Sequence, residues 1–85
     1  MLPDPCKFHF AENGDLVYGN YGGANYSAGH TGGVLTFTTA DPAPVDAYDL
    51  LYYQHDAWYQ IFSDPVHRFE ADVRLAEGIS HLLFC

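Results

Sequence analysis

Residues 46–62 read DAYDLLYYQHDAWYQIF, and this uninterrupted stretch predicts the helix around which the rest of the chain packs. Asp46 is a suitable N-cap, Pro44 ahead of it is a breaker, and no Gly or Pro falls inside the stretch. The apolar stripe expected in the core, spaced by three and four, is Leu50, Tyr53, Ala57 and Ile61. A second stripe, which ordinary packing does not require, is Asp49, Tyr52, Asp56 and Tyr59.

A second helix is predicted over residues 65–78. The triplet SDP at 63–65 ends the first helix and supplies an N-cap and a first-turn proline for the next. Helices joined by so short a turn lie antiparallel, so residues equally distant from the turn face each other. His55 precedes the turn by eight or nine positions and Asp72 follows it by as many, and we therefore expect them to meet.

An imidazole that is hydrogen-bonded to a carboxylate is prepared to act as a base through its other ring nitrogen. Tyr59, one turn after His55, is placed to donate a hydrogen bond to Asp72. The alternative is a satisfied structural pair formed by His55 and the adjacent Asp56, because buried polar groups require partners in any protein.

The segment 18–33, YGNYGGANYSAGHTGG, holds six of the eight glycines and predicts a loop. Asp56 points about 100° away from His55 around the helix, so it needs a partner of its own. Ca²⁺ accepts backbone carbonyls together with a carboxylate, and this loop with Asp56 offers both. A phosphate-binding turn is the weaker alternative, since the loop has neither a lysine nor a long preceding strand.

The composition restricts the possible partners. The 85 residues carry a net charge of −8 with only three Lys and Arg residues, which argues against nucleic acid and anionic bilayers and suits a bound cation. No stretch is long and apolar enough for a membrane span, and the N-terminus has no signal-peptide pattern. Cys6 and Cys85 are either two free thiols or one bridge between the ends of the chain.

The remaining segments give weaker signals. Residues 1–15 predict an irregular entry with at most a short strand, and VLTFTT at 34–39 predicts a strand or an extended connection. Asp46 and Asp49 are expected to serve the N-terminus of the helix through its dipole. The fold expected is therefore mainly α, a single domain over 1–85 with two antiparallel helices and a Gly-rich calcium-binding loop. The abrupt apolar end, ISHLLFC, suggests a larger protein.

These motifs together resemble the secreted phospholipase A2 superfamily. Its signature is a Tyr-Gly-x-Tyr-x-Gly-x-Gly calcium loop, a Pro-Val-Asp, a His-Asp-x-x-Tyr helix nine residues later, and an Asp on a second antiparallel helix. Here the corresponding segments are YGNYGGANYSAG at 18–29, PVD at 44–46, HDAWY at 55–59 and EADVRLAEGI at 70–79. The resemblance covers roughly residues 18–79, and it implies a phospholipase A2-like fold.

The resemblance implies a role for each matching residue. His55 would activate a water that attacks the sn-2 ester of a glycerophospholipid, while Asp72 orients His55 and Tyr59 supports Asp72. The Gly23 N–H and a calcium ion would stabilise the oxyanion. The implied calcium ligands are the Asp56 carboxylate and the backbone carbonyls of Tyr21, Gly23 and Asn25.

The sequence also departs from the family. Asn25 replaces a usual Gly, although Asn tolerates left-handed backbone angles. No amphipathic N-terminal helix is visible, and the family's disulfide framework is absent, as in cysteine-poor bacterial and viral versions of the domain. The family's half-cystines are replaced by Asn20, Gly22, Leu51, Tyr52, Trp58 and Ala71.

Three functions follow as hypotheses. The first is a calcium-dependent phospholipase A2, a hydrolase secreted from the producing cell, because resting cytosol holds little free calcium. The second is a catalytically inactive calcium-binding or protein-interaction module on the same scaffold. The third is a two-helix structural domain with an incidental His-Asp pair. Head-group preference, acyl-chain preference, biological target and oligomeric state are not encoded in any motif that we identify.

Overall fold

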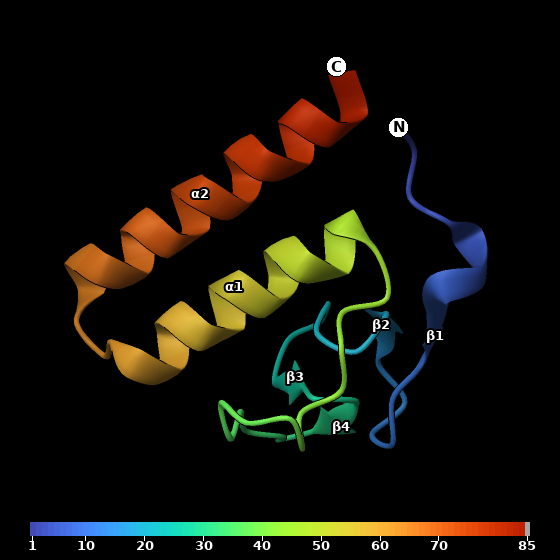
Figure 1. Cartoon of the computed structure of the whole chain (residues 1–85), viewed down its shortest axis with the longest axis horizontal. Coiled ribbons are helices and arrows are strands. Elements are labelled where there is room, and N and C mark those ends of the chain that lie inside the picture. The colour runs from blue at the N-terminus through green and yellow to red at the C-terminus, as the bar shows by residue number, and fades with distance from the viewer. Residues whose placement is uncertain (85) are drawn as a thin grey trace.

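The computed structural model describes residues 1–84, and its fold is mixed α/β. Two long helices pack together, and two small antiparallel hairpins lie beside α1, on the side away from α2 (Figure 1). The elements are a 3₁₀ turn at Pro5–Lys7, β1 (Phe8–Phe10), β2 (Leu16–Tyr18), β3 (Tyr26–Ser27), β4 (His30–Thr31), α1 (Ala47–Ile61) and α2 (Pro65–Phe84). The prediction of a mainly α, phospholipase A2-like fold was wrong, because both hairpins lie in segments expected to be irregular or loop.

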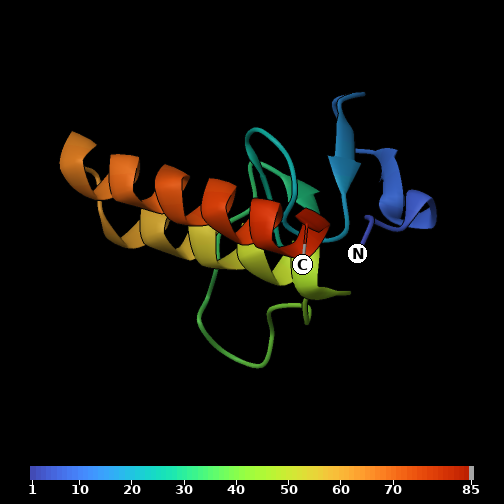
Figure 2. The ribbon, with the colours of Figure 1, turned by 90° about the horizontal axis from the view of Figure 1, so that it is seen from above.

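The first helix has nearly the predicted bounds. Asp46 is its N-cap and accepts a hydrogen bond from the Asp49 N–H, and the Phe62 N–H closes its last turn on the Trp58 carbonyl. The second helix starts at Pro65 as predicted but continues past Gly78 to Phe84. Gly78 lies inside α2 where the helix packs closely against α1, since a Cβ there would lie 2.6 Å from Leu51 Cδ2. The two helices run side by side in the view from above (Figure 2).

The hairpins depend on turn residues in the left-handed backbone region. In β1–β2 the pair Phe10 and Leu16 closes a loop that contains Asn13 and Gly14, and Gly14 has φ 88°. In β3–β4 the two turn residues Ala28 and Gly29 have φ of 52° and 80°. Two successive positive φ values are typical of a type I′ turn, whose twist matches that of paired strands. Short strands with tight turns therefore form where the glycine density predicted only a loop.

The core is built largely of tyrosine. The buried hydrophobic residues are Val17, Tyr18, Tyr21, Tyr26, Leu35, Tyr48 and Ala71. The predicted core stripe was wrong at both ends, since Leu50 and Ile61 are 44% and 63% exposed. The second stripe of α1 faces inward instead, because Asp49 is fully buried and holds the glycine-rich segment against the helix.

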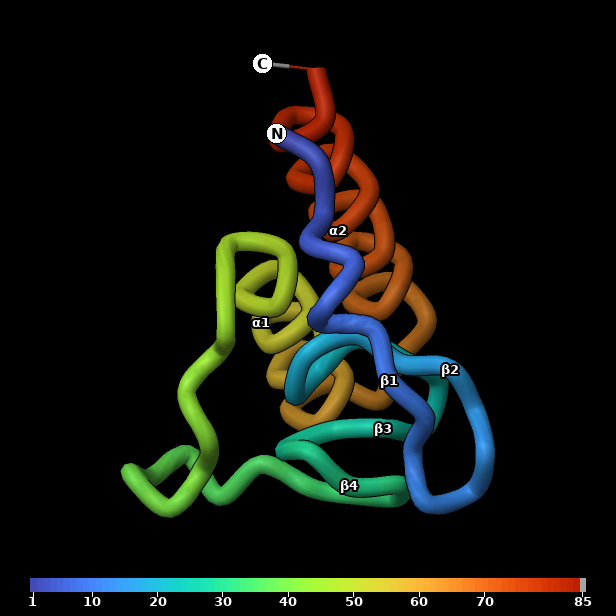
Figure 3. Tube along the Cα trace, turned by 90° about the vertical axis from the view of Figure 1, so that its right-hand side faces the viewer, coloured from blue at the N-terminus to red at the C-terminus, as the bar shows by residue number. Residues whose placement is uncertain are grey.

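The end-on view shows how the chain closes around α1 (Figure 3). The segment between β4 and α1 passes along one side of the molecule. Within it, the Leu35 N–H donates to the Gln60 side-chain oxygen and the Leu35 carbonyl accepts from the Gln60 amide, both at 2.7 Å. In the part of the chain that is described, no helix is long and apolar enough to cross a membrane. The alternative bridge between Cys6 and Cys85 involves a residue outside the described ones.

Candidate functional site

His55 and Asp72 meet across the helix pair. The His55 Nε2 atom lies 2.7 Å from Asp72 Oδ1, and the Tyr59 hydroxyl donates to the same oxygen at 2.7 Å. The rings of His55 and Tyr59 also contact each other, with centroids 4.4 Å apart. Equal distance from the short turn positions the first pair, and a helical turn positions the second. The hydrogen bonds expected from the sequence are thus present.

The two nitrogens of His55 have different surroundings. Nε2 is taken by Asp72, whereas Nδ1 faces Asp56, whose Oδ1 lies 3.8 Å away, beyond hydrogen-bonding distance. The neutral tautomer that satisfies Asp72 carries its proton on Nε2 and leaves Nδ1 as an acceptor. This is the arrangement of a general base that is oriented by a carboxylate.

The charges of the site shift the pKa values of its members. Interaction with the Asp56 carboxylate, and then with Asp72, raises the pKa of His55 above its ordinary value, although burial opposes this. Hydrogen bonds from Tyr59 and then His55 lower the pKa of Asp72, so this carboxyl is ionised when His55 acts as a base. Burial raises the pKa of Asp56, and the neighbouring His55 partly offsets that effect.

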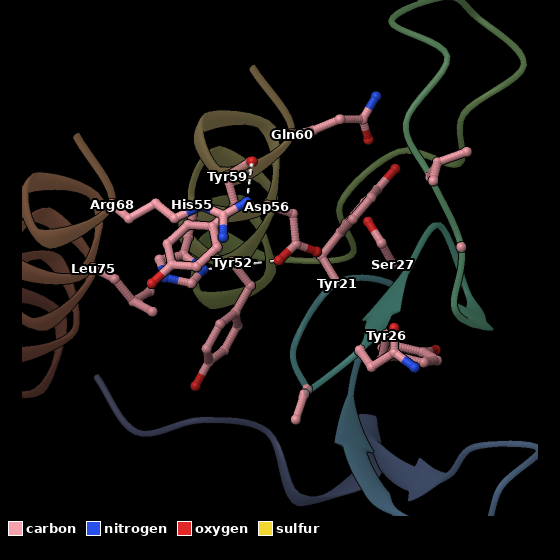
Figure 4. A pocket seen from close by; sticks show the side chains of 15 residues that line it. Tyr21, Tyr26, Ser27, Tyr52, His55, Asp56, Tyr59, Gln60, Arg68 and Leu75 are labelled. Atoms are coloured by element: carbon pink, nitrogen blue, oxygen red, sulfur yellow. Dashed lines mark hydrogen bonds and ion pairs between the residues drawn. The ribbon is translucent and has the colours of Figure 1, made fainter. Parts of the chain in front are cut away.

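A cavity of about 680 Å³ joins these residues to the glycine-rich segment. Tyr21, Gly23 and Asn25 line it from the segment. His55, Asp56 and Tyr59 line it from α1 (Figure 4). The volume lies within the range of small-molecule sites. Every residue predicted for the site therefore lines this one cavity except Asp72, which reaches it through its hydrogen bond to His55.

The glycine-rich segment is held in place by Asp49. This carboxylate is fully buried and accepts hydrogen bonds from the backbone N–H groups of Asn20, Tyr21 and Val45. Gly19 is required beside it, because a Cβ there would lie 2.5 Å from Asp49 Cγ. The prediction that Asp49 serves only the helix dipole was therefore incomplete, since its side chain fixes the segment opposite Asp56.

Several oxygens around the cavity have no hydrogen-bond partner among the described residues. Asp56 Oδ2 and Ser27 Oγ are both buried in this state. The carbonyls of Asn20 and Gly22 accept backbone hydrogen bonds, whereas those of Tyr21 and Gly23 accept none within the described chain. The buried side-chain oxygens of Asp56 and Ser27 are costly without donors unless a cation coordinates them, and an all-oxygen set is what Ca²⁺ prefers. These residues therefore fit the ion.

Asn25 fits the predicted ligand set less well. It does adopt the left-handed conformation that a glycine would favour, with φ 50°. Its carbonyl, however, accepts a hydrogen bond from the Gly32 N–H at 2.7 Å. The Ser27 hydroxyl is a better candidate, and sequence reasoning missed it because the β3–β4 turn that positions it was not predicted. No group of three or more His, Cys, Asp and Glu side chains with metal-site geometry occurs in the described chain.

Comparisons of the chain with protein-family models, with curated proteins and with solved structures found no match.

Proposed function

We propose that this chain hydrolyses the sn-2 ester of glycerophospholipids in a calcium-dependent reaction. The observation that carries the proposal is the position of His55, which is hydrogen-bonded to Asp72 on one side and faces the Asp56 cavity on the other. The substrate class comes from the motif resemblance, which concerns sequence motifs within residues 18–79 and not the fold.

The proton transfers follow from the two nitrogens of His55. A water held at Nδ1 gives up its proton as its oxygen attacks the ester carbonyl, and Asp72 stabilises the resulting imidazolium. Collapse of the tetrahedral intermediate breaks the ester C–O bond. The same nitrogen then returns the proton to the departing alkoxide, so the products are a fatty acid and a lysophospholipid.

The oxyanion requires a donor in the cavity. The backbone N–H of Gly23 donates no hydrogen bond among the described residues and belongs to the lining of the cavity. A backbone N–H that is free to donate can stabilise developing negative charge there. Gly23 must be glycine for a separate reason, since a Cβ there would lie 2.6 Å from Val17 Cγ1.

Calcium would be held by the Asp56 carboxylate, the carbonyls of Tyr21 and Gly23, and the Ser27 hydroxyl. The motif resemblance adds the Asn25 carbonyl as a third backbone ligand. When bound, the ion supplies Lewis-acid polarisation of the substrate carbonyl. A calcium requirement suits action outside the producing cell, and we include that location in the proposal.

The proposal is tested with His55→Gln in an assay of fatty-acid release from phosphatidylcholine micelles. We expect release by the wild type to stop in a calcium chelator and to fall at least about a thousandfold in the variant, because the base is lost. Turnover that persists in His55→Gln contradicts the assignment of the base.

His30→Gln is the matched control. His30 also pairs with a carboxylate, at 2.9 Å from Glu12, but the pair is largely exposed and neither residue lines the cavity. This variant should keep the wild-type rate. Calcium-dependent thermal stabilisation without any turnover would instead favour the inactive calcium-binding module.

A further inference from the structure

Arg68 is the one strongly basic residue that lines the cavity of the proposed active site. The chain has three such residues, Lys7, Arg68 and Arg74, against eleven acidic ones. Only Arg68 among them borders the space shared by His55, Asp56 and the glycine-rich segment. Arg68 therefore puts a positive charge beside this cavity in a chain whose net charge is −8.

The position of the guanidinium group is fixed. Its Nε donates to the Phe62 carbonyl and its Nη2 to the Tyr59 carbonyl, both at 3.1 Å. Its Cζ lies 4.8 Å from the centroid of the Tyr59 ring, and the other ring contact of Tyr59 is with His55. Figure 4 shows Arg68 reaching from α2 toward Tyr59. The charge is therefore held one side chain away from the proposed base.

The positive charge of Arg68 has no acidic partner. Arg74, on the same helix, pairs with Glu70 at 3.0 Å, but no carboxylate of the described residues forms an ion pair with Arg68. The two carbonyl bonds use two of the five N–H donors of a guanidinium group, and the others donate to no described residue. Donors that are already ordered bind an anion without a further entropic cost, and guanidinium matches phosphate oxygens in a bidentate manner.

We propose that Arg68 binds the phosphate diester of the substrate and sets the preference of the enzyme for phospholipids over neutral glycerides. The inference rests on the proposed function and adds the residue that recognises the head-group side of the ester. The zwitterionic and anionic phospholipids share this phosphate, so the preference concerns the phosphate and not the alcohol attached to it. Arg68 is a substrate-binding residue in this account and takes no part in proton transfer.

The test compares kcat/KM for phosphatidylcholine with kcat/KM for a diacylglycerol of the same chain lengths, each in the same neutral detergent micelles. Arg68→Gln should lower the ratio of the two values about ten- to a hundredfold, because one charge-assisted contact is lost only with the phospholipid. A structural role for Arg68, capping the end of α1, would instead lower both values together and leave the ratio unchanged. That result overturns the inference.

Arg74→Gln is the matched control. Its guanidinium also lies over an aromatic ring, 5.1 Å from the centroid of Trp58, but it faces a different cavity and is paired with Glu70. The ratio should stay at the wild-type value in this variant. A ratio that falls equally in both variants indicates a general charge effect and contradicts a specific role for Arg68.

A second measurement needs no variant and is made on the calcium-free wild type. Addition of inorganic phosphate should shift the side-chain Nε–H resonance of Arg68 in an NMR titration and leave that of Arg74 in place. Equal shifts, or none, overturn the inference. These results can be told apart from a failure of the proposed function. A wild type that hydrolyses neither lipid contradicts the proposed phospholipase activity, whereas the phosphate titration still tests the Arg68 site.

Discussion

Asp49 is the residue on which the geometry of the cavity depends most. Its carboxylate is fully buried, and each oxygen accepts backbone N–H groups from the glycine-rich segment. Hydrogen bonds to a charged acceptor are stronger than neutral ones, and they are aligned only when the segment follows its observed path. The side chain therefore connects the start of α1 to the Tyr21 and Gly23 carbonyls proposed for calcium.

Replacement of Asp49 by Asn should destabilise the protein by about 3 kcal/mol, because an amide presents N–H donors to N–H groups of the backbone. Chemical denaturation measures the change. Asp15→Asn is the control, since Asp15 is exposed and its side chain accepts from Asn13 within one turn. Its free energy of unfolding should change by less than about 0.5 kcal/mol. Equal losses in both variants would contradict the role of Asp49.

Tyr18 gives a prediction about alkaline pH. Burial, and then a hydrogen bond to Asp46, raises the pKa of its phenol from 10.0 to about 12. The unfolded chain loses this proton first, so the contribution of Tyr18 to stability is complete below pH 10 and is lost as the pH rises toward 12. In Tyr18→Phe the free energy of unfolding should fall less steeply over this interval. The same slope in both proteins would contradict the assignment.

The sequence allowed the contacts between helices to be predicted, but not those that involve the loop. His55, Asp72 and Tyr59 lie on regular helices, so helical periodicity and a short turn determine which side chains meet. Ser27 and Asn25 lie in a segment whose path depends on Asp49 and on individual φ values. Periodicity carries no information about such a path, so it could not show that the Asn25 carbonyl accepts a hydrogen bond from the Gly32 N–H.

At the scale of elements, the β3–β4 hairpin forms one wall of the cavity. Gly33, which follows β4, packs against the backbone of β3. A Cβ at this position would lie 2.0 Å from the Ser27 carbonyl oxygen, and the Gly33 N–H donates to the His30 carbonyl at 3.1 Å. The backbone after β4 thus passes directly over the backbone of β3. This close approach places Ser27 and Val34 on the same side of the cavity.

Gly33→Ala should therefore destabilise the protein by about 2–3 kcal/mol, since a backbone oxygen cannot move aside as a flexible side chain does. Gly32→Ala is the neighbouring control. A Cβ at Gly32 meets nothing within 4 Å, and only its φ of 69° opposes the change, so the cost should be about 1 kcal/mol. Thermal unfolding ranks the two variants, and a larger loss in Gly32→Ala would contradict the packing argument.

The helices were the predictable elements and the hairpins were not. Caps, breakers and an uninterrupted stretch predicted Ala47–Ile61 closely, because each of these signals is local. The predicted second helix, 65–78, is shorter than α2, because glycine can either end a helix or lie inside it and the sequence alone does not distinguish the two. The strands have only two or three residues, too few for an alternating pattern to be recognised.

For the whole molecule, the mixed α/β architecture places a carboxylate and carbonyl-rich backbone on opposite walls of one cavity. The net charge of −8 favours the approach of a divalent cation over that of an anionic surface. Composition and charge therefore lead us to expect a cation as the partner. The fold class could not be predicted from them, because it depends on hairpins specified by single turn residues.

Millimolar calcium should raise the melting temperature by about 10 °C or more. A ligand that binds only the folded state at a hundredfold excess over its Kd contributes about 2.7 kcal/mol, which is a large shift for a chain of this size. Asp56→Asn should abolish the shift. Asp64→Asn, at an exposed cap of α2 where Asn serves as well, should retain it. A shift that persists in Asp56→Asn would place calcium elsewhere.

The most direct measurement of the central claim is the release of fatty acid from phosphatidylcholine labelled in its sn-2 chain, followed as free calcium is varied. The account predicts labelled fatty acid and unlabelled lysophospholipid in calcium and neither product in a chelator. Folded protein that releases no label at any calcium concentration would contradict the account, as would release that is independent of calcium.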